Sequence, residues 1–151
     1  MRDPRQLALA YLADHQVLTL ATHGADGVWA AAVFYAHDGF DLVFLSADST
    51  RHARHLRENP WAAGAIQEDY REWTAIRGIQ LEGTVQHLEG ASRETAVTLY
   101  GRRFPFVAQP HGQIAQALAR VAWYRLTPRR LYWIDNSQGL GRRDLIIGVD
   151  V

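Results

Sequence analysis

Short hydrophobic stretches joined by glycine-containing turns constrain the fold of this chain more than any other feature of its sequence. The first three stretches that read as strands cover residues 16–22, 28–36 and 40–45. The turns between them contain Asp26-Gly27 and Asp38-Gly39. An Asp-Gly pair between two such stretches is a strong signal of a β-hairpin. Three strands connected in this way form an antiparallel meander.

The rest of the chain alternates further strand segments with short helices. A first helix is expected over residues 4–14, with Asp3 as N-cap and Pro4 at its first position. Further helical segments are residues 51–58, 91–100 and 112–120, and further strand segments are 61–67, 78–88, 121–127 and 130–134, the last two separated at Thr127-Pro128. Many short strands at hairpin spacing favour a closed sheet, which leaves few exposed edges. We therefore predict a mainly β (α+β) fold, a six-stranded antiparallel split β-barrel with flanking helices, as a single domain over residues 1–151.

Composition limits the classes of function that this chain can have. Its 16 basic and 16 acidic residues balance, whereas a dedicated nucleic-acid-binding protein usually has a basic excess. The chain has no cysteine, which removes disulfides, thiol nucleophiles and thiolate metal sites. Its N-terminal residues lack the apolar run of a secretory signal, and no stretch is long and apolar enough to span a bilayer. We expect a cytoplasmic protein with neither a nucleic acid nor a membrane as partner.

The segment after the third strand, residues 46–60, is the strongest candidate for a binding site. Ser49 and Thr50 precede Arg51 and His52 at the start of a short helix, which Asn59-Pro60 closes. Two cations in a first helical turn lie unfavourably against the helix dipole unless an anion is bound there. Free backbone N–H groups, two hydroxyls and a guanidinium would together hold a phosphate. A basic helix that merely faces water explains the same residues, and the sequence alone leaves both interpretations open.

Other chemistry-bearing residues form no recognisable motif. The sequence contains no P-loop, dinucleotide-binding glycine pattern or nucleophile elbow, and it suggests no catalytic residue. His52 and His55 lie three apart and could share a cation, but the neighbouring arginines would repel it, so solvent-facing or anion-pairing histidines are favoured and no metal site is predicted. The aromatic residues of the later strands and Trp61 and Trp73 belong either to the core or to a flat wall for a planar ring.

The order of these features resembles the pyridoxamine 5'-phosphate oxidase-like family of FMN-binding split barrels. The resemblance extends over about residues 5–135 and is carried by Val33-Phe34-Tyr35, Phe44-Leu45-Ser46, Ser49-Thr50-Arg51-His52, Leu56, Asn59-Pro60 and the segment from Arg77 to Gly83. Phe104-Pro105-Phe106 and residues 134–141 are similar to the small bacterial YhbP-type branch of this family.

The resemblance implies a homodimer with two FMN sites at the subunit interface and an oxidoreductase acting on an unidentified small molecule. It assigns Thr50, Arg51 and His52 to the flavin phosphate, although His52 stands where the oxidase has lysine, so that its charge depends on pH. Ser46 and Ser49 would lie near the phosphate and ribityl chain. The backbone of the second strand would follow the flavin ring along Ala32, Val33, Phe34 and Tyr35. The partner subunit would contribute polar and aromatic groups, and the candidates are Gln67, Trp73 and Gln80.

Several alternatives remain open from the sequence. The chain lacks the basic C-terminal segment with which the oxidase holds its pyridoxal substrate, so oxidation of pyridoxamine phosphate is not expected. Arg142 and Arg143 offer substitute anion-binding groups or are simply solvated. Haem-binding and deazaflavin-dependent proteins share the fold, and His111 would be the candidate haem ligand. A dimer that binds flavin without catalysis is a further possibility.

Overall fold

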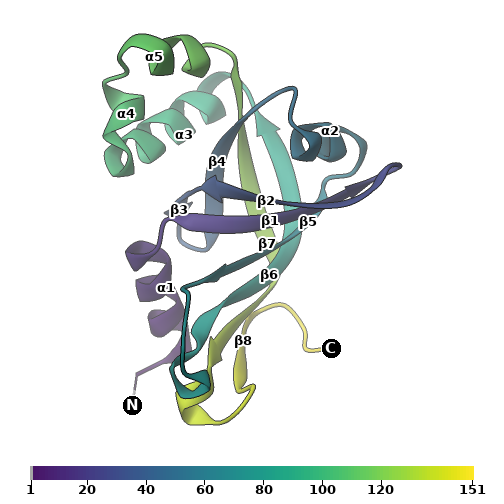
Figure 1. Ribbon diagram of the computed structural model, residues 1–151, viewed down its shortest axis with the longest axis vertical. Coiled ribbons are helices and arrows are strands. Elements are labelled where there is room, and N and C mark those ends of the chain that lie inside the picture. The colour runs from purple at the N-terminus through teal and green to yellow at the C-terminus, as the bar shows by residue number, and fades with distance from the viewer. Residues whose placement is uncertain (1) are drawn as a thin grey trace.

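One antiparallel sheet of eight strands organises the molecule. The computed structural model describes residues 2–151. The strand order is β2-β1-β5-β6-β7-β4-β3, with β8 pairing to β7. The strands are β1 (Val17–Gly24), β2 (Gly27–Phe34), β3 (Ala36–Asp38), β4 (Asp41–Ala47), β5 (Trp61–Gln67), β6 (Arg77–Leu88), β7 (Val121–Asp135) and β8 (Arg143–Ile147). The sheet is curled into a half-barrel in which β1 and β2 cross the long strands β6 and β7 (Figure 1). This confirms the split-barrel prediction.

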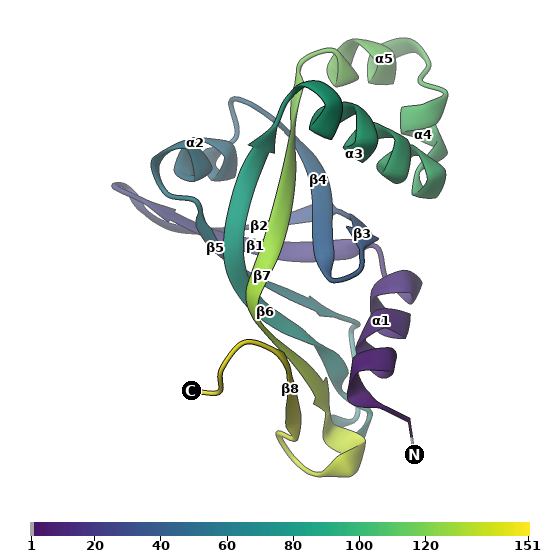
Figure 2. The same cartoon turned by 180° about the vertical axis from the view of Figure 1, so that it is seen from behind.

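Helices flank the sheet at three places. The helix α1 (Pro4–Asp14) begins at Asp3, whose carboxylate accepts a hydrogen bond from the Arg5 amide, and α2 (Arg51–Glu58) lies beside the β1–β2 hairpin. The helices α3 (Gly90–Arg103), α4 (Pro105–Ala108) and α5 (Gly112–Leu118) form a group beyond one end of β6 and β7 (Figure 2). Two short 3₁₀ turns, η1 (Trp73–Ala75) and η2 (Asn136–Gln138), lie near the other end. Among residues 2–151, no helix has the length and apolar character needed to cross a membrane.

The core divides into two apolar clusters, one on each part of the sheet. The larger one packs α1 against the inner side of the sheet and includes Leu12, Leu20 and Phe44. The smaller one joins α3 and α4 to β4 and β7 through Tyr100 and Trp123, whose rings meet edge to face. The residues of β1 alternate between this interior and the outer surface, as period-two side-chain placement requires, whereas most of β2 is exposed. The core therefore leaves the outer face of β1, β2 and β5 uncovered.

The sheet has eight strands rather than the predicted six, and two features of the chain account for the difference. The predicted strand over residues 28–36 is two strands, because the chain changes partners at Tyr35. Residues up to Phe34 pair with β1, whereas Ala36 pairs with Val43 of β4. Buried Tyr35 anchors this corner, since its hydroxyl donates to the Leu12 carbonyl. The second difference is β8, which pairs with β7 beyond the η2 turn and is absent from the sequence-based assignment.

The predicted break at Thr127-Pro128 is wrong, since β7 runs without interruption from Val121 to Asp135. Proline removes one ladder donor and is tolerated where the pairing is irregular. The β6–β7 register shifts between Glu82 and Gly83, so that Gly83 faces Pro128. This bulge accommodates the proline, and the long curved pair β6–β7 remains the backbone of the half-barrel.

Candidate functional site

The start of α2 is built by a capped turn that follows β4 directly. Thr50 is the N-cap, and its hydroxyl accepts from the Ala53 amide at 3.2 Å while donating to the Ala47 carbonyl at 2.9 Å. Asn59 closes the helix through a bond from its amide to the His55 carbonyl, as the Asn-Pro signal predicted. Ser49 is exposed at the tip of this turn. The capped turn fixes where the first side chains of α2 point.

His52 points inward rather than toward solvent. Its Nε2 lies 2.6 Å from the Ser46 Oγ and 3.3 Å from the Thr50 Oγ1, and both Ser46 and His52 are buried. Burial, with a smaller contribution from His55, lowers the pKa of His52 below its ordinary value. The ring is therefore neutral at pH 7. The structure uses Ser46 and His52 to bind each other inside the molecule.

His55 links α2 to the β1–β2 hairpin. Only 1% of its surface is exposed. Its Nε2 lies 2.6 Å from the Asp26 Oδ1, and its Nδ1 lies 2.9 Å from the Thr22 Oγ1. Because a carboxylate only accepts, Nε2 donates to Asp26, and in the neutral ring Nδ1 accepts from the Thr22 hydroxyl. Both ring nitrogens are thus satisfied by residues about 30 positions earlier in the chain.

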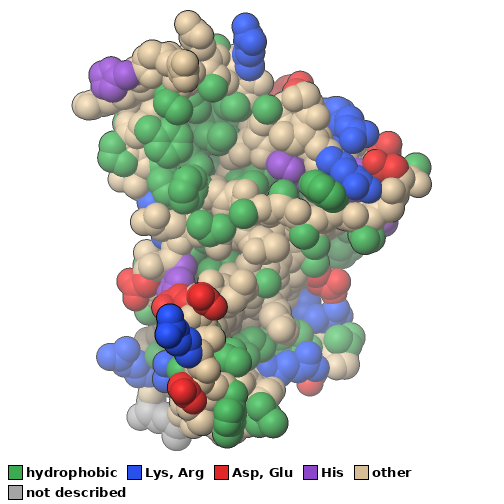
Figure 3. Space-filling model, viewed as in Figure 1, with side chains coloured by type: hydrophobic (Ala, Val, Ile, Leu, Met, Phe, Trp, Pro, Cys, Tyr) green, Lys and Arg blue, Asp and Glu red, His purple; other side chains and the backbone are tan. Residues whose placement is uncertain are grey.

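Arg51 is held against the tip of the same hairpin. Its Nη2 donates to the Asp26 carbonyl at 2.9 Å, and its Nε lies 3.3 Å from the Asp26 Oδ2. The guanidinium stacks over the Trp29 ring, with its central carbon 4.7 Å from the ring centre. The side chain keeps 29% of its surface exposed. Cationic, acidic and histidine side chains gather over α2 and this hairpin tip in Figure 3.

The carboxyl group of Asp26 makes this cluster sensitive to acid. The hydrogen bond from His55, followed by the charge of Arg51, holds the pKa of Asp26 below its ordinary value. A carboxyl with a lowered native pKa stabilises the fold above its unfolded pKa, and this contribution is lost as the pH falls through the native value.

We therefore expect Asp26→Asn to lower the free energy of unfolding at pH 7, with the difference from wild type shrinking as the pH falls toward 3. Urea unfolding of both proteins at several pH values measures this. A difference that stays constant through the acid range would contradict the assignment of the ionised carboxylate as the stabilising group.

The second strand has a free edge beside α2. In the sheet of residues 2–151, β2 is the end strand and pairs with β1 alone. Most of its residues are exposed, including Ala32 and Phe34, whereas Val33 and Tyr35 point into the core. Both α2 and β4 contact β2. The Phe34 carbonyl on this edge accepts from the Tyr100 hydroxyl at 3.3 Å. Edge backbone groups that make no such bond are available to a ligand or another chain.

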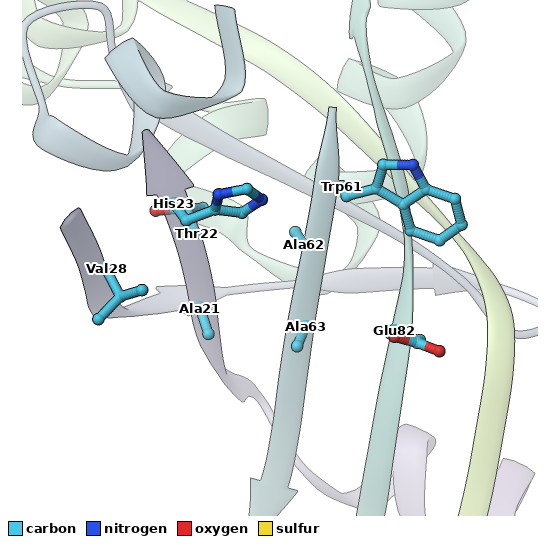
Figure 4. A pocket seen from close by; sticks show the side chains of 8 residues that line it. All are labelled: Ala21, Thr22, His23, Val28, Trp61, Ala62, Ala63 and Glu82. Atoms are coloured by element: carbon cyan, nitrogen blue, oxygen red, sulfur yellow. The ribbon is translucent and has the colours of Figure 1, made fainter. Parts of the chain in front are cut away.

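A hollow of about 310 Å³ lies on the outer face of β1, β5 and β6 (Figure 4). Alanines form its floor, while His23 and Trp61 stand at its rim; the lining residues are Ala21, Thr22, His23, Val28, Trp61, Ala62, Ala63 and Glu82. A neighbouring hollow of about 240 Å³ shares Ala63 and Glu82 with it and adds Gln80, Arg130 and Tyr132. Glu82 and Arg130 form an ion pair between β6 and β7. Together these hollows form an apolar trough with a charged wall.

This trough and the α2 cluster lie on opposite faces of the β1–β2 hairpin. Thr22 points toward α2, because its hydroxyl contacts His55. Alternate residues of a strand point to opposite faces, so Ala21 and His23 point toward the trough. Trp29, the cross-strand partner of Thr22, therefore points toward α2, and Val28, the partner of His23, points toward the trough. The β2 edge is where the two faces meet.

The residues assigned to a partner subunit lie at the far end of the sheet from α2. Gln67 and Gln80 line a third hollow of about 180 Å³ beside Gly78. Trp73 is exposed on η1, where its carbonyl accepts from the Asn136 side chain at 3.0 Å. In one chain, Gln80 pairs with Ala65 and Ala65 with Thr19, three residues along β1 from the Thr22 that contacts α2, and Gln67 lies two residues beyond Ala65. The structure therefore brings the predicted residues together as two groups rather than one.

Known proteins match this chain over most of its length. The family model described as pyridoxamine 5'-phosphate oxidase matches residues 5–135. The chain belongs to the pyridoxamine 5'-phosphate oxidase family. Within this family it is 34% identical to a UPF0306 protein of Photorhabdus laumondii over 91% of this chain and 92% of the other. It is 30% identical to the UPF0306 protein YhbP of Salmonella schwarzengrund, over 88% of this chain and 86% of the other.

Solved structures similar to this pyridoxamine 5'-phosphate oxidase family member support the fold. A heme binding protein from Mycobacterium smegmatis matches with a TM-score of 0.78 and 24% identity, covering 98% of this chain and 59% of that protein. HutZ, the heme storage protein from Vibrio cholerae, matches with a TM-score of 0.71 and 21% identity, covering 87% of this chain and 94% of HutZ. At these identities the likeness establishes the split-barrel fold.

Sequence reasoning missed several residues that the family fold assembles around α2. Asp26 was interpreted only as a turn former, and Thr22 and Trp29 were not connected with Arg51. His55 was placed beside Arg51 on the helix, but not against the hairpin. No local pattern links them, because they meet only when the hairpin packs on the helix. Glu82 and Arg130 of the trough were missed for the same reason. Within residues 2–151, no group of three or more His, Asp or Glu side chains is arranged to hold a metal ion.

Proposed function

We propose that this protein binds FMN along the free edge of β2, with the phosphate at the start of α2. In this proposal it is a homodimeric flavoprotein that acts as an oxidoreductase on a small molecule. The observation that carries the proposal is the meeting of three features at one place: an exposed edge strand, the capped N-terminus of α2, and the partly exposed side chain of Arg51. Family membership makes flavin the first ligand to consider.

The residues at the start of α2 fit a phosphate in part. The exposed hydroxyl of Ser49 and the first backbone N–H groups of α2 are available, and a helix N-terminus favours an anion. The Nε of Arg51 is buried and has no hydrogen-bond acceptor among residues 2–151. A buried donor of this kind favours an additional acceptor. Ser46 and His52 support the site from behind, since they already bond each other.

The remaining assignments follow from where the structure places each side chain. The backbone along Ala32 and Phe34 would face the flavin ring, with Val33 and Tyr35 holding the strand in the core. FMN supplies hydride and single-electron transfer when bound, and the protein positions and tunes it. Arg51 and Ser49 would bind and orient the phosphate, and Trp29 would keep the guanidinium in place. No side chain is assigned as a general acid or base.

The proposal includes a homodimer because the two groups of predicted residues lie apart within a single chain. Gln67 lies at the end of β5 and Trp73 on η1, both away from α2, whereas Gln80 lines the hollow next to the trough. A second copy packed on the outer face would bring its own group to the β2 edge. Exposed Val28, Trp61 and Phe34 would then become buried, which favours association.

Haem is the second candidate ligand, because the solved heme binding protein and heme storage protein have this fold. A haem protein needs an accessible axial ligand, and histidine is a common one. His111 is exposed at the start of α5, and His87 is exposed on β6. The apolar trough beside Trp61 would suit a planar macrocycle as well as a flavin ring.

An absorbance spectrum of the natively purified protein separates the two candidates. We expect flavin bands in the blue after supplementation with FMN and desalting, and no Soret band after the same treatment with haemin. Retention of haemin with a Soret band, together with loss of FMN on desalting, would reject the flavin proposal in favour of haem.

A further inference from the structure

One of the two edges through which the Arg51 guanidinium can bind an oxyanion in a two-point manner, the Nε–Nη2 edge, faces the protein itself. Arginine grips phosphate or carboxylate most strongly through two parallel N–H groups. In Arg51 the Nη2 donates to the Asp26 carbonyl at 2.9 Å, and the Nε faces the Asp26 carboxylate at 3.3 Å. One residue therefore lies against both donors of that edge, with its backbone carbonyl on Nη2 and its carboxylate facing Nε. A phosphate that binds Arg51 through this Nε–Nη2 edge has to displace Asp26.

This internal contact is imperfect, which makes displacement feasible. The Nε of Arg51 is buried, yet the Asp26 oxygen does not lie in line with its N–H, so the donor has no hydrogen bond among the described residues. The carboxylate also faces Arg54 at 4.0 Å and His55 at 2.6 Å. Its own side chain is 48% exposed. Asp26 is thus an anion held by three side chains of α2 at the position where an external anion would be attracted.

The backbone allows Asp26 to move without disrupting the sheet. Asp26 lies in the two-residue turn between Gly24 and Gly27, which form the last pair of the β1–β2 ladder. Gly27 has a φ of 115°, a conformation that other residues rarely adopt. One further contact holds the turn, from the Ala25 amide to the Glu58 Oε2 at 3.1 Å. Displacement of this turn would therefore break none of the β1–β2 strand pairs.

We propose that Asp26 competes with the phosphate of FMN for Arg51, and thereby determines how tightly the protein holds a phosphorylated flavin relative to an unphosphorylated one. This inference rests on the proposed function, because it concerns the same site. The carboxylate is ionised at neutral pH, since its hydrogen bond with His55 and the charge of Arg51 lower its pKa. Removing its charge ends the ion pair with the Arg51 Nε and removes a repulsion between two anions, whereas the bond from Nη2 to the Asp26 backbone carbonyl does not depend on the side chain. Riboflavin lacks the phosphate and is unaffected.

Titration of FMN and riboflavin into wild type and Asp26→Asn tests this inference. We expect Asp26→Asn to bind FMN about 5- to 10-fold more tightly and riboflavin unchanged. Glu58→Gln is the matched control, because it removes one negative charge from the same turn contact without touching Arg51; its FMN affinity should change less than about twofold. Asp26→Ser provides a second variant with the same expectation, and circular dichroism establishes that each variant is folded.

The outcomes separate the inference from the function on which it rests. Unchanged or weaker FMN binding by both Asp26 variants, with wild type binding normally, overturns the competition and leaves the flavin proposal standing. An equal gain in Glu58→Gln overturns it as well, since only net charge would then matter. Failure of all variants to bind FMN overturns both proposals. As an independent readout, titration of wild type with inorganic phosphate should shift the backbone amide NMR signals of Asp26 and Gly27, and unmoved signals at saturation count against displacement.

Discussion

Replacing Arg51 with alanine should weaken FMN binding by about 1.5–3 kcal/mol, the value of a hydrogen bond to a charged group. This corresponds to about a 10- to 150-fold higher dissociation constant. Arg51 is the cationic side chain at the start of α2 that is partly exposed and stacks on an aromatic ring, Trp29. Quenching of flavin fluorescence during titration measures the change.

Arg57→Ala is the matched control for this experiment. Arg57 lies on the same helix and carries the same charge, but it pairs with Asp48 at 3.5 Å and does not contact the β1–β2 hairpin. Its FMN affinity should stay close to that of wild type. Arg57→Ala loses only a surface ion pair and should unfold near the wild-type temperature. Arg51→Ala also loses its bond to the Asp26 carbonyl and its stack on Trp29, so circular dichroism must establish that it is folded before titration. An unchanged affinity in Arg51→Ala would remove the phosphate from the start of α2.

Replacing Gly83 with alanine should destabilise the fold by about 3 kcal/mol, at the upper end of the usual cost of overpacking. A Cβ at this position would lie 2.1 Å from the Thr127 carbonyl oxygen and 2.8 Å from the Pro128 Cα. Both are backbone atoms of the neighbouring strand, so neither can rotate away. The bulge opposite Pro128 would have to open, and with it the β6–β7 pair that carries the trough.

Gly101→Ala in α3 is the control for Gly83→Ala. Its Cβ would meet Ala108 at 3.4 Å, an ordinary van der Waals contact. Alanine is favoured over glycine in a helix by about 1 kcal/mol, so this variant should be as stable as wild type or slightly more stable. Urea unfolding of both variants measures the difference. Equal stability of Gly83→Ala and wild type would show that the glycine is not required at the bulge.

Local signals in the sequence predicted most of the elements. The helix over residues 4–14 and the strand over residues 61–67 occur with the predicted ends, and Asn59-Pro60 closes α2 as expected. These features depend on caps, turn residues and short-range alternation, which the sequence displays directly. The strand at Thr127-Pro128 was broken in the prediction because proline was considered alone. Its tolerance depends on Gly83, which is 45 residues earlier and meets it only in the folded sheet.

The sequence predicted where the candidate site lies along the chain, but not which side chains contact one another there. The motif from Ser49 to His52 located the start of α2, but the surroundings of each side chain are tertiary. His52 and His55 look like part of a charged helix surface, yet Ser46 and Thr22 enclose them. Asp26 is a turn residue by sequence and an ion-pair partner of α2 in the structure. These pairings are set by how the hairpin packs on the helix, which no spacing within one segment can reveal.

The contacts of Asp26 with Arg51 and His55 are expected to favour the stability of the free protein and to oppose FMN binding. Asp26 stabilises the free protein through Arg51 and His55, and in our proposal it opposes the phosphate. Asp26→Asn should therefore be less stable than wild type at pH 7 while binding FMN more tightly. Functional sites commonly retain arrangements that are not the most stable ones.

Titration of the purified protein with FMN is the most direct measurement of the central claim. The account predicts quenching of flavin fluorescence that saturates at about one FMN per chain, with the saturated protein migrating as a dimer in size-exclusion chromatography. Absence of saturable FMN binding by folded protein would contradict it.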